Sequence, residues 1–120
     1  MMTIDEVLNM MRQGMGKLPP AIEKAAVVDP ALVMEHARSK GFAMPADKPA
    51  LDEQTRTLVY LAAALAGSST GCVQAMANKI AQQGIPADKV LETVHIVRLA
   101  MASKIIGDAD PVLAVMMPKA

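Results

Sequence analysis

Apolar residues recur at intervals of three and four along most of the chain, which is the spacing of one face of an α-helix. No segment alternates apolar and polar residues for long enough to indicate a β-strand. Gly, Pro, Ser and Asp, which begin and end helices, separate the apolar segments. The pattern therefore predicts an all-α fold of about six helices and a short final turn. The predicted helices span residues 4–15, 21–28, 30–40, 53–66, 70–83 and 86–105, and the turn covers 112–117.

Several predicted helix ends carry residues suited to bonding free backbone groups. Thr3 and Glu6 have the spacing of a capping box, and Asp29 and Asp52 stand where N-cap residues are expected. Glycine tolerates the left-handed conformation that ends many helices, and four glycines are predicted to act in this way. These are Gly16, Gly41, Gly84 and Gly107.

The predicted helix 86–105 is apolar on more than one side. A helix of this kind must be covered on several sides, and a small domain has few helices for that purpose. We therefore expect a second subunit to supply part of the cover, which makes the protein a homo-oligomer that assembles through apolar helix faces. The main stripe is Val90, Val94, Val97, Met101 and Ile105, and Leu91, Ile96, Leu99 and Ala100 lie at other angles.

Charge and composition exclude several classes of protein. The 120 residues are expected to form one domain, 1–120, in which 12 basic and 12 acidic side chains balance. The sequence has no stripe of basic residues, so no nucleic-acid partner is expected. The longest apolar run, LVYLAAALAG, is about half the length that crosses a bilayer, so no membrane partner is expected. A single cysteine and an N-terminus without a basic-then-apolar leader predict a reducing, cytoplasmic location.

That cysteine, Cys72, is predicted to lie in the first turn of helix 70–83, after an N-cap at Ser68 or Ser69. Free N–H groups and the helix dipole favour a thiolate there, which makes Cys72 a candidate nucleophile. Lys79 lies two turns further on and could assist only by folding back. The alternative interpretation is a small, buried apolar cysteine without chemistry.

Two histidines complete the candidate chemistry. His95 follows Glu92 by three residues, so the two can form a base and its orienting carboxylate, or merely a half-buried histidine with a satisfied partner. His36 is expected to be an exposed helix residue. These residues have no metal-ligand spacing, and the 11 methionines are expected to pack the core, so neither a metal nor a cofactor is predicted.

The order of these features resembles the carboxymuconolactone decarboxylase and AhpD-like (alkylhydroperoxidase-like) family. The similar region covers roughly residues 15–106. It includes the segment GKLPPAIEKAAVVDPALVMEHARSKG and, beyond it, an Ala-rich helix, a small-residue break and a helix that bears a thiol. The resemblance implies an all-helical bundle that assembles as trimers or hexamers.

The peroxidase branch of that family carries the motif C-x-x-C-x-x-x-H, together with an upstream Glu. Here Cys72 matches the second cysteine, Ser69 replaces the first, and Met76 replaces the histidine. The upstream glutamate falls near Thr57, with Glu53 one turn earlier. A sulfenic acid on Cys72 therefore has no resolving thiol in its own chain and needs an external thiol reductant or a cysteine from another chain.

Three functions remain open from the sequence. The first is an AhpD-like antioxidant that reduces peroxides through Cys72, with His95, Glu92 or Lys79 as helpers. The second is a non-catalytic oligomer or small-molecule binder that kept the fold and lost the relay. The third is a decarboxylase-like acid–base enzyme that uses His95 and Glu92, although the histidine that the decarboxylase branch places near Met76 is absent.

Overall fold

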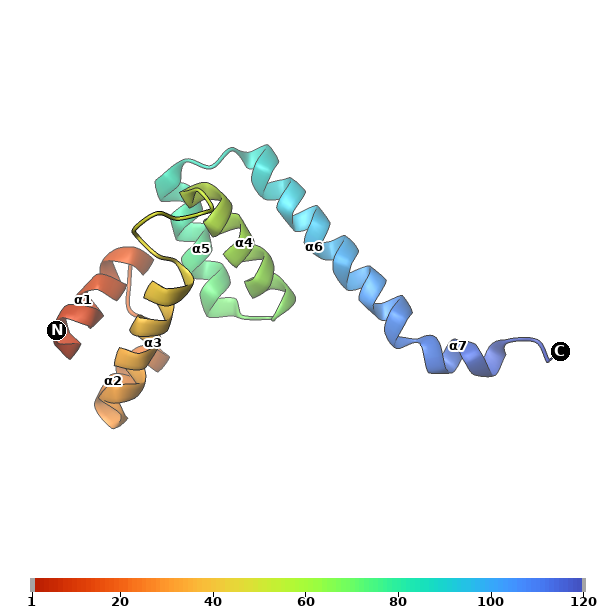
Figure 1. Cartoon of the computed structure of the whole chain (residues 1–120), viewed down its shortest axis with the longest axis horizontal. Coiled ribbons are helices and arrows are strands. Elements are labelled where there is room, and N and C mark those ends of the chain that lie inside the picture. Colours follow the sequence, from red (N-terminus) through yellow and green to blue (C-terminus); the bar gives the residue numbers. More distant parts are fainter. Residues whose placement is uncertain (1, 120) are drawn as a thin grey trace.

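The computed structural model describes residues 2–119, which form seven helices and contain no strand, so the all-α prediction is confirmed for that range. Figure 1 shows three groups of helices along the long axis: α1 to α3 at one end, α4 and α5 in the middle, and α6 and α7 at the other end. The helices are α1 (Ile4–Met15), α2 (Pro20–Val28), α3 (Pro30–Ala43), α4 (Glu53–Ala66), α5 (Thr70–Gln83), α6 (Ala87–Asp108) and α7 (Asp110–Met116).

The predicted capping residues begin their helices. Thr3, Asp29 and Asp52 each accept a hydrogen bond from the backbone N–H three residues later, at 3.2, 3.3 and 2.9 Å. Gly84 ends α5 in the left-handed conformation, with φ 62°. These local bonds satisfy backbone groups that a helix end otherwise leaves free.

Two helices continue past the glycine that was predicted to end them. α3 runs through Gly41 to Ala43, and α6 runs through Gly107 to Asp108. Neither glycine has a positive φ, so neither forms the left-handed cap that the prediction assumed. α3 instead ends before Pro45, whose ring disfavours helical geometry in the residue before it.

The buried side chains form two small clusters. The first joins α1 and α3 and consists of Val7, Met11, Leu18 and Val33. The second joins α4 and α5 and consists of Leu61, Ala75 and Met76. Met15 packs against both, and its carbonyl accepts a hydrogen bond of 2.8 Å from Asn78 Nδ2, which ties α1 to α5. The two clusters therefore form one continuous body from α1 to α5.

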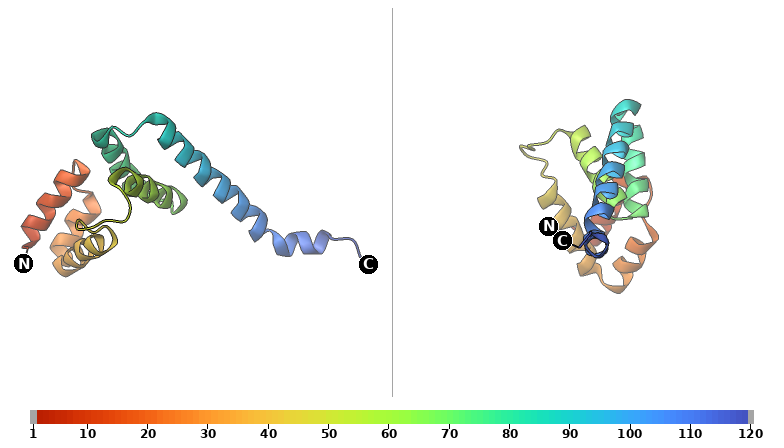
Figure 2. Two further views of the ribbon diagram at one scale, coloured as in Figure 1. Left: turned by 45° about the horizontal axis from the view of Figure 1, so that its top comes forward. Right: turned by 90° about the vertical axis from the view of Figure 1, so that its right-hand side faces the viewer.

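α6 and α7 leave this body as a projecting arm, defined here as residues 87–116 (Figures 1 and 2). Only the start of α6 packs against the body, through Val90. No residue of either helix is buried. The radius of gyration is 19.0 Å, whereas a compact domain of this length has about 14 Å. Most of the apolar surface predicted for this helix thus has no cover from its own chain.

Between residues 2 and 119, no helix combines the length and the apolar character that spanning a membrane requires.

Replacing Leu61 with alanine tests the second cluster. Leu61 is 5% exposed and contacts α5, so the Leu61→Ala variant should lose about 2–5 kcal/mol of unfolding free energy in urea titrations. Leu32→Ala, at a side chain that is 57% exposed on α3, is the matched control and should change stability by less than about 1 kcal/mol. Equal losses in the two variants would contradict the assignment of the core.

Candidate thiol site

The site is built by the tight connection between α4 and α5. Three residues, 67–69, join the helices, so they form an antiparallel hairpin (Figure 1). The backbone N–H groups of Gly67 and Ser69 donate to carbonyls of the last turn of α4, each at 2.9 Å. Ser68 adopts a left-handed conformation with φ 56°, which reverses the chain. This turn places the first residues of α5 against the side of α4.

Cys72 lies in that first turn, as predicted, and is partly buried. Its Sγ atom is 3.4 Å from the hydroxyl oxygen of Tyr60, which projects from α4. Ser69 occupies the N-cap position of α5, but its side chain makes no capping bond to the backbone. Cys72 therefore has a phenol beside it and a serine hydroxyl within its own turn.

These two hydroxyls set the protonation of the site. A hydrogen bond from Ser69, and then one from Tyr60, lowers the pKa of the Cys72 thiol from its ordinary value, while partial burial opposes them. The same contact with Cys72, together with burial, raises the pKa of Tyr60. At neutral pH the phenol consequently stays protonated and can donate to the sulfur, which favours the nucleophilic thiolate.

The other predicted site residues are not joined to Cys72. Within residues 2–119, neither His95 nor Glu92 hydrogen-bonds to the thiol or to the other, and both are exposed on α6. Lys79 is half-buried on α5, without a hydrogen bond to the sulfur. Met76 is 6% exposed and belongs to the α4–α5 core. The structure thus brings Cys72 together with Tyr60 and Ser69.

Thr57, near which the resemblance places the family's upstream glutamate, makes structural contacts. It is 4% exposed, and its Oγ1 lies 3.1 Å from the Glu53 carbonyl oxygen and 3.1 Å from Gln83 Oε1. These bonds join the start of α4 to the end of α5. Thr57 therefore holds the hairpin closed at the end opposite Cys72. Its hydroxyl cannot take the place of a carboxylate in proton transfer.

Tyr60 was not identified from the sequence. It is the only tyrosine in the chain, and it interrupts the Ala- and Leu-rich second half of α4, residues 58–66, which has no other polar side chain. A phenol partly buried on such a helix needs a hydrogen-bond partner, and this requirement was the available signal. The sequence alone does not identify Cys72 as the partner of Tyr60, because that depends on the rotation of α5 about its own axis. The turn at residues 67–69 determines this rotation.

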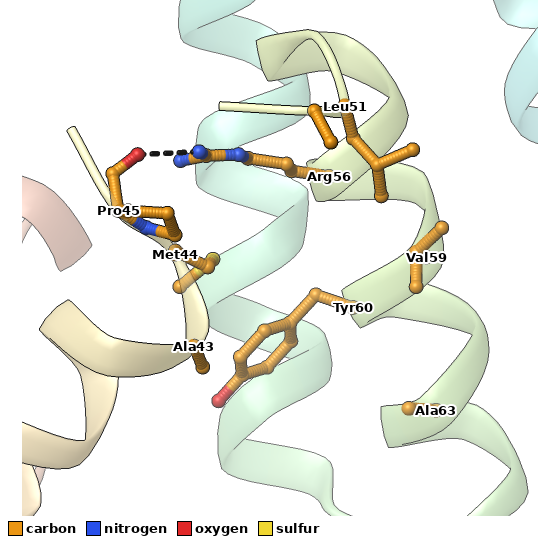
Figure 3. A pocket seen from close by; sticks show the side chains of 9 residues that line it. Ala43, Met44, Pro45, Leu51, Arg56, Val59, Tyr60 and Ala63 are labelled. Atoms are coloured by element: carbon orange, nitrogen blue, oxygen red, sulfur yellow. Dashed lines mark hydrogen bonds between the residues drawn. The ribbon is translucent and has the colours of Figure 1, made fainter. Parts of the chain in front are cut away.

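The ring of Tyr60 also lines an open groove of about 430 Å³ between the end of α3 and α4 (Figure 3). Arg56 crosses one end of the groove and donates a hydrogen bond to the Pro45 carbonyl. The Tyr60 hydroxyl points away from Arg56. The Tyr60 ring therefore lines an apolar groove, while the hydroxyl at the tip of the ring contacts the Cys72 thiol. The remaining lining residues are Ala43, Met44, Ala50, Leu51, Val59 and Ala63.

Comparison with known proteins bears on the fold. No family model matches the chain, and no curated protein matches it. The structure is similar to the crystal structure of an alkylhydroperoxidase AhpD core from Rhodospirillum rubrum, with a TM-score of 0.69 and 24% sequence identity. The match covers 98% of this chain and 82% of that one. At this level of identity the likeness establishes the fold: the chain has an AhpD-like all-helical fold.

Proposed function

We propose that this protein is an AhpD-like thiol antioxidant that reduces hydroperoxides through Cys72. The observation that carries the proposal is the contact between the Cys72 sulfur and the Tyr60 hydroxyl, in the first turn of a helix. It combines a thiol of lowered pKa with a proton donor, and both groups are needed to cleave an O–O bond. The AhpD-like fold supports the same class of reaction.

In the proposed reaction the Cys72 thiolate attacks one oxygen of a hydroperoxide. An S–O bond forms, the O–O bond breaks, and the leaving alkoxide takes a proton and departs as an alcohol. Tyr60 is placed to deliver that proton and to recover it from solvent. Cysteine is thereby oxidised by two electrons to a sulfenic acid, and the peroxide is reduced to the alcohol.

Reduction of the sulfenic acid requires thiols from outside the chain. Ser69 occupies the place of a resolving cysteine, and the chain has no second thiol. One external thiol condenses with the sulfenic acid, releasing water and forming a mixed disulfide. A second external thiol then attacks this disulfide, regenerating Cys72 and leaving an external disulfide. A small cytoplasmic thiol has the chemistry for both steps.

Tyr60 takes over the proton transfer that the family assigns to a histidine. Met76 cannot carry a proton, and its thioether is packed in the core. We propose Ser69 and Tyr60 as the groups that activate Cys72. His95, Glu92 and Lys79 make no hydrogen bond to the thiol within residues 2–119.

The pH dependence of Cys72 alkylation tests the lowered pKa. The iodoacetamide rate should reach half its plateau at a pH below about 8.5, the usual pKa of a free thiol, because the folded protein stabilises the thiolate. Peroxide treatment should also yield a dimedone adduct that the Cys72→Ser variant lacks. A midpoint at or above that of a model thiol, without an adduct, would favour the non-catalytic alternative.

The Tyr60→Phe variant tests the role of the phenol. It keeps the ring and removes the donor, so the pKa of Cys72 should rise and alkylation at pH 7 should slow about two- to fivefold, the partial exposure of the pair limiting the effect. At a pH above the Cys72 pKa in both the unmodified protein and the variant, the alkylation rates of the two proteins should converge. An equal reduction at every pH would indicate a packing defect instead.

The Ser69→Cys variant should restore the missing resolving thiol. After one equivalent of peroxide we expect an intramolecular disulfide between the introduced thiol and Cys72, seen by mass spectrometry as the loss of a pair of hydrogens, since the first turn holds the two positions close together. The control, Ser69→Ala, should stop at the sulfenic acid. Persistence of the sulfenic acid in Ser69→Cys would show that a side chain at this position cannot reach the sulfur.

A further inference from the structure

The groove beside Tyr60 has the composition of a small-molecule site. Among its lining residues Arg56 bears the only charge, and Tyr60 has the only other polar side chain. The remaining lining side chains are all apolar. Small-molecule sites are usually concave and mostly apolar, with a few polar groups that fix the orientation of the ligand, and a volume of about 430 Å³ is typical of them. The groove therefore suits a ligand with an apolar body and one polar end.

Arg56 indicates the charge of that polar end. Its side chain is half-buried, and it donates one hydrogen bond to the Pro45 carbonyl. Within residues 2–119 no carboxylate forms an ion pair with it. A guanidinium presents its N–H donors in a planar fork, which can bind both oxygens of a carboxylate at once. A cation that is partly withdrawn from water is stabilised by such a partner. We thus expect the carboxylate of a ligand at this end of the groove.

From Arg56 the groove runs along α4 toward the thiol. Arg56, Val59, Tyr60 and Ala63 line it from α4, at the spacing of one helix face. Arg56 and Ala63 are seven residues apart, which is about 10 Å along the helix axis, and they lie at opposite ends of this row in Figure 3. The Tyr60 hydroxyl points away from Arg56 and lies 3.4 Å from the Cys72 sulfur. A ligand held by its carboxylate at Arg56 can therefore extend its apolar chain along the groove toward Cys72.

We infer that the substrate is a hydroperoxide of an apolar carboxylic acid, such as a medium-chain fatty acid oxidised at the end far from its carboxylate, and that Arg56 selects this carboxylate. The inference rests on the function proposed above and specifies its substrate. Hydrogen peroxide is too small to contact Arg56 and Cys72 at once. A neutral alkyl hydroperoxide can cover the apolar walls but leaves the charge of Arg56 without a partner. A hydroperoxy acid uses both features of the groove.

The carboxylate takes no part in the chemistry and stays at Arg56 throughout. The Cys72 thiolate attacks the outer oxygen of the hydroperoxide, so that an S–O bond forms while the O–O bond breaks. The inner oxygen takes a proton from the Tyr60 hydroxyl, and the substrate becomes a hydroxy acid. Cys72 is oxidised to the sulfenic acid, which the external thiol then reduces. Arg56 is accordingly a substrate-binding residue, and its effect should depend on the charge of the substrate.

Binding of unreactive acids to the Cys72→Ser variant tests the groove without the reaction. Calorimetric titration should give a dissociation constant for decanoate about three- to tenfold below that of methyl decanoate, because the ester lacks the charge that Arg56 binds. Octanoate should bind more weakly than decanoate, by about two- to fourfold for each methylene that it lacks. Equal binding of decanoate and its ester would overturn Arg56 as the selecting residue. Equal binding of octanoate and decanoate would overturn the groove as the site of the chain.

The rate of Cys72 oxidation tests the substrate itself. The chain has a single thiol, so the loss of titratable thiol follows the reaction directly. Decanoic acid with a hydroperoxide on its terminal carbon should oxidise Cys72 about three- to tenfold faster than its methyl ester does. In Arg56→Gln this ratio should fall toward one, and Arg56→Lys should keep part of it. The matched control, Arg98→Gln at an exposed position on α6, removes the same charge and should keep the ratio of the unmodified protein.

The ratio of acid to ester separates this inference from the function on which it rests. A packing defect in Arg56→Gln slows both substrates and leaves their ratio unchanged, so a changed ratio reports the charge alone. If acid and ester oxidise Cys72 of the unmodified protein equally fast, or if Arg98→Gln loses the ratio as Arg56→Gln does, the substrate inference is wrong and the thiol peroxidase remains. If hydrogen peroxide, the ester and the acid all leave Cys72 reduced, the proposed function is wrong and the substrate inference falls with it.

Discussion

The packing of α4 against α5 across a three-residue turn is the constraint on which the site depends. Leu61, Ala75 and Met76 form its core, and Thr57 joins its open end to Gln83. Because the turn at residues 67–69 is so short, it determines which face of α5 meets α4. The contact between Cys72 and Tyr60 is a result of that rotation, so the chemistry of the thiol follows from helix packing. A looser connection would leave the thiol near the same place without its donor.

Helix positions followed from the sequence because their causes are local. An aspartate or threonine at an N-cap bonds a backbone N–H three residues away, and no distant contact is needed to recognise it. The glycines were less informative. Gly84 ends α5 in the left-handed conformation, but Gly41 and Gly107 lie inside helices, since glycine tolerates either state. α3 ends two residues before Pro45, and α6 continues one residue past Gly107 to Asp108.

The site was only half predictable for a related reason. Cys72 in a first helix turn is a local feature, and the sequence located it. Tyr60 comes from the neighbouring helix, and its contact depends on the relative rotation of two helices. His95 and Glu92 share one face of α6, as their spacing implied, but α6 projects from the body and carries them away from the thiol of their own chain. A catalytic role for these two residues stays a prediction, because the sequence did not determine how α6 packs.

The chain contains no tryptophan and a single tyrosine. Tyr60 is therefore almost the whole near-ultraviolet chromophore of the protein, and it lies in contact with the sulfur and on the wall of the groove. Ionisation or oxidation of Cys72 changes the electric field at that ring, and anything that enters the groove changes its solvent exposure. The fluorescence and circular dichroism of the unmodified protein are consequently an intrinsic, label-free record of events at one residue.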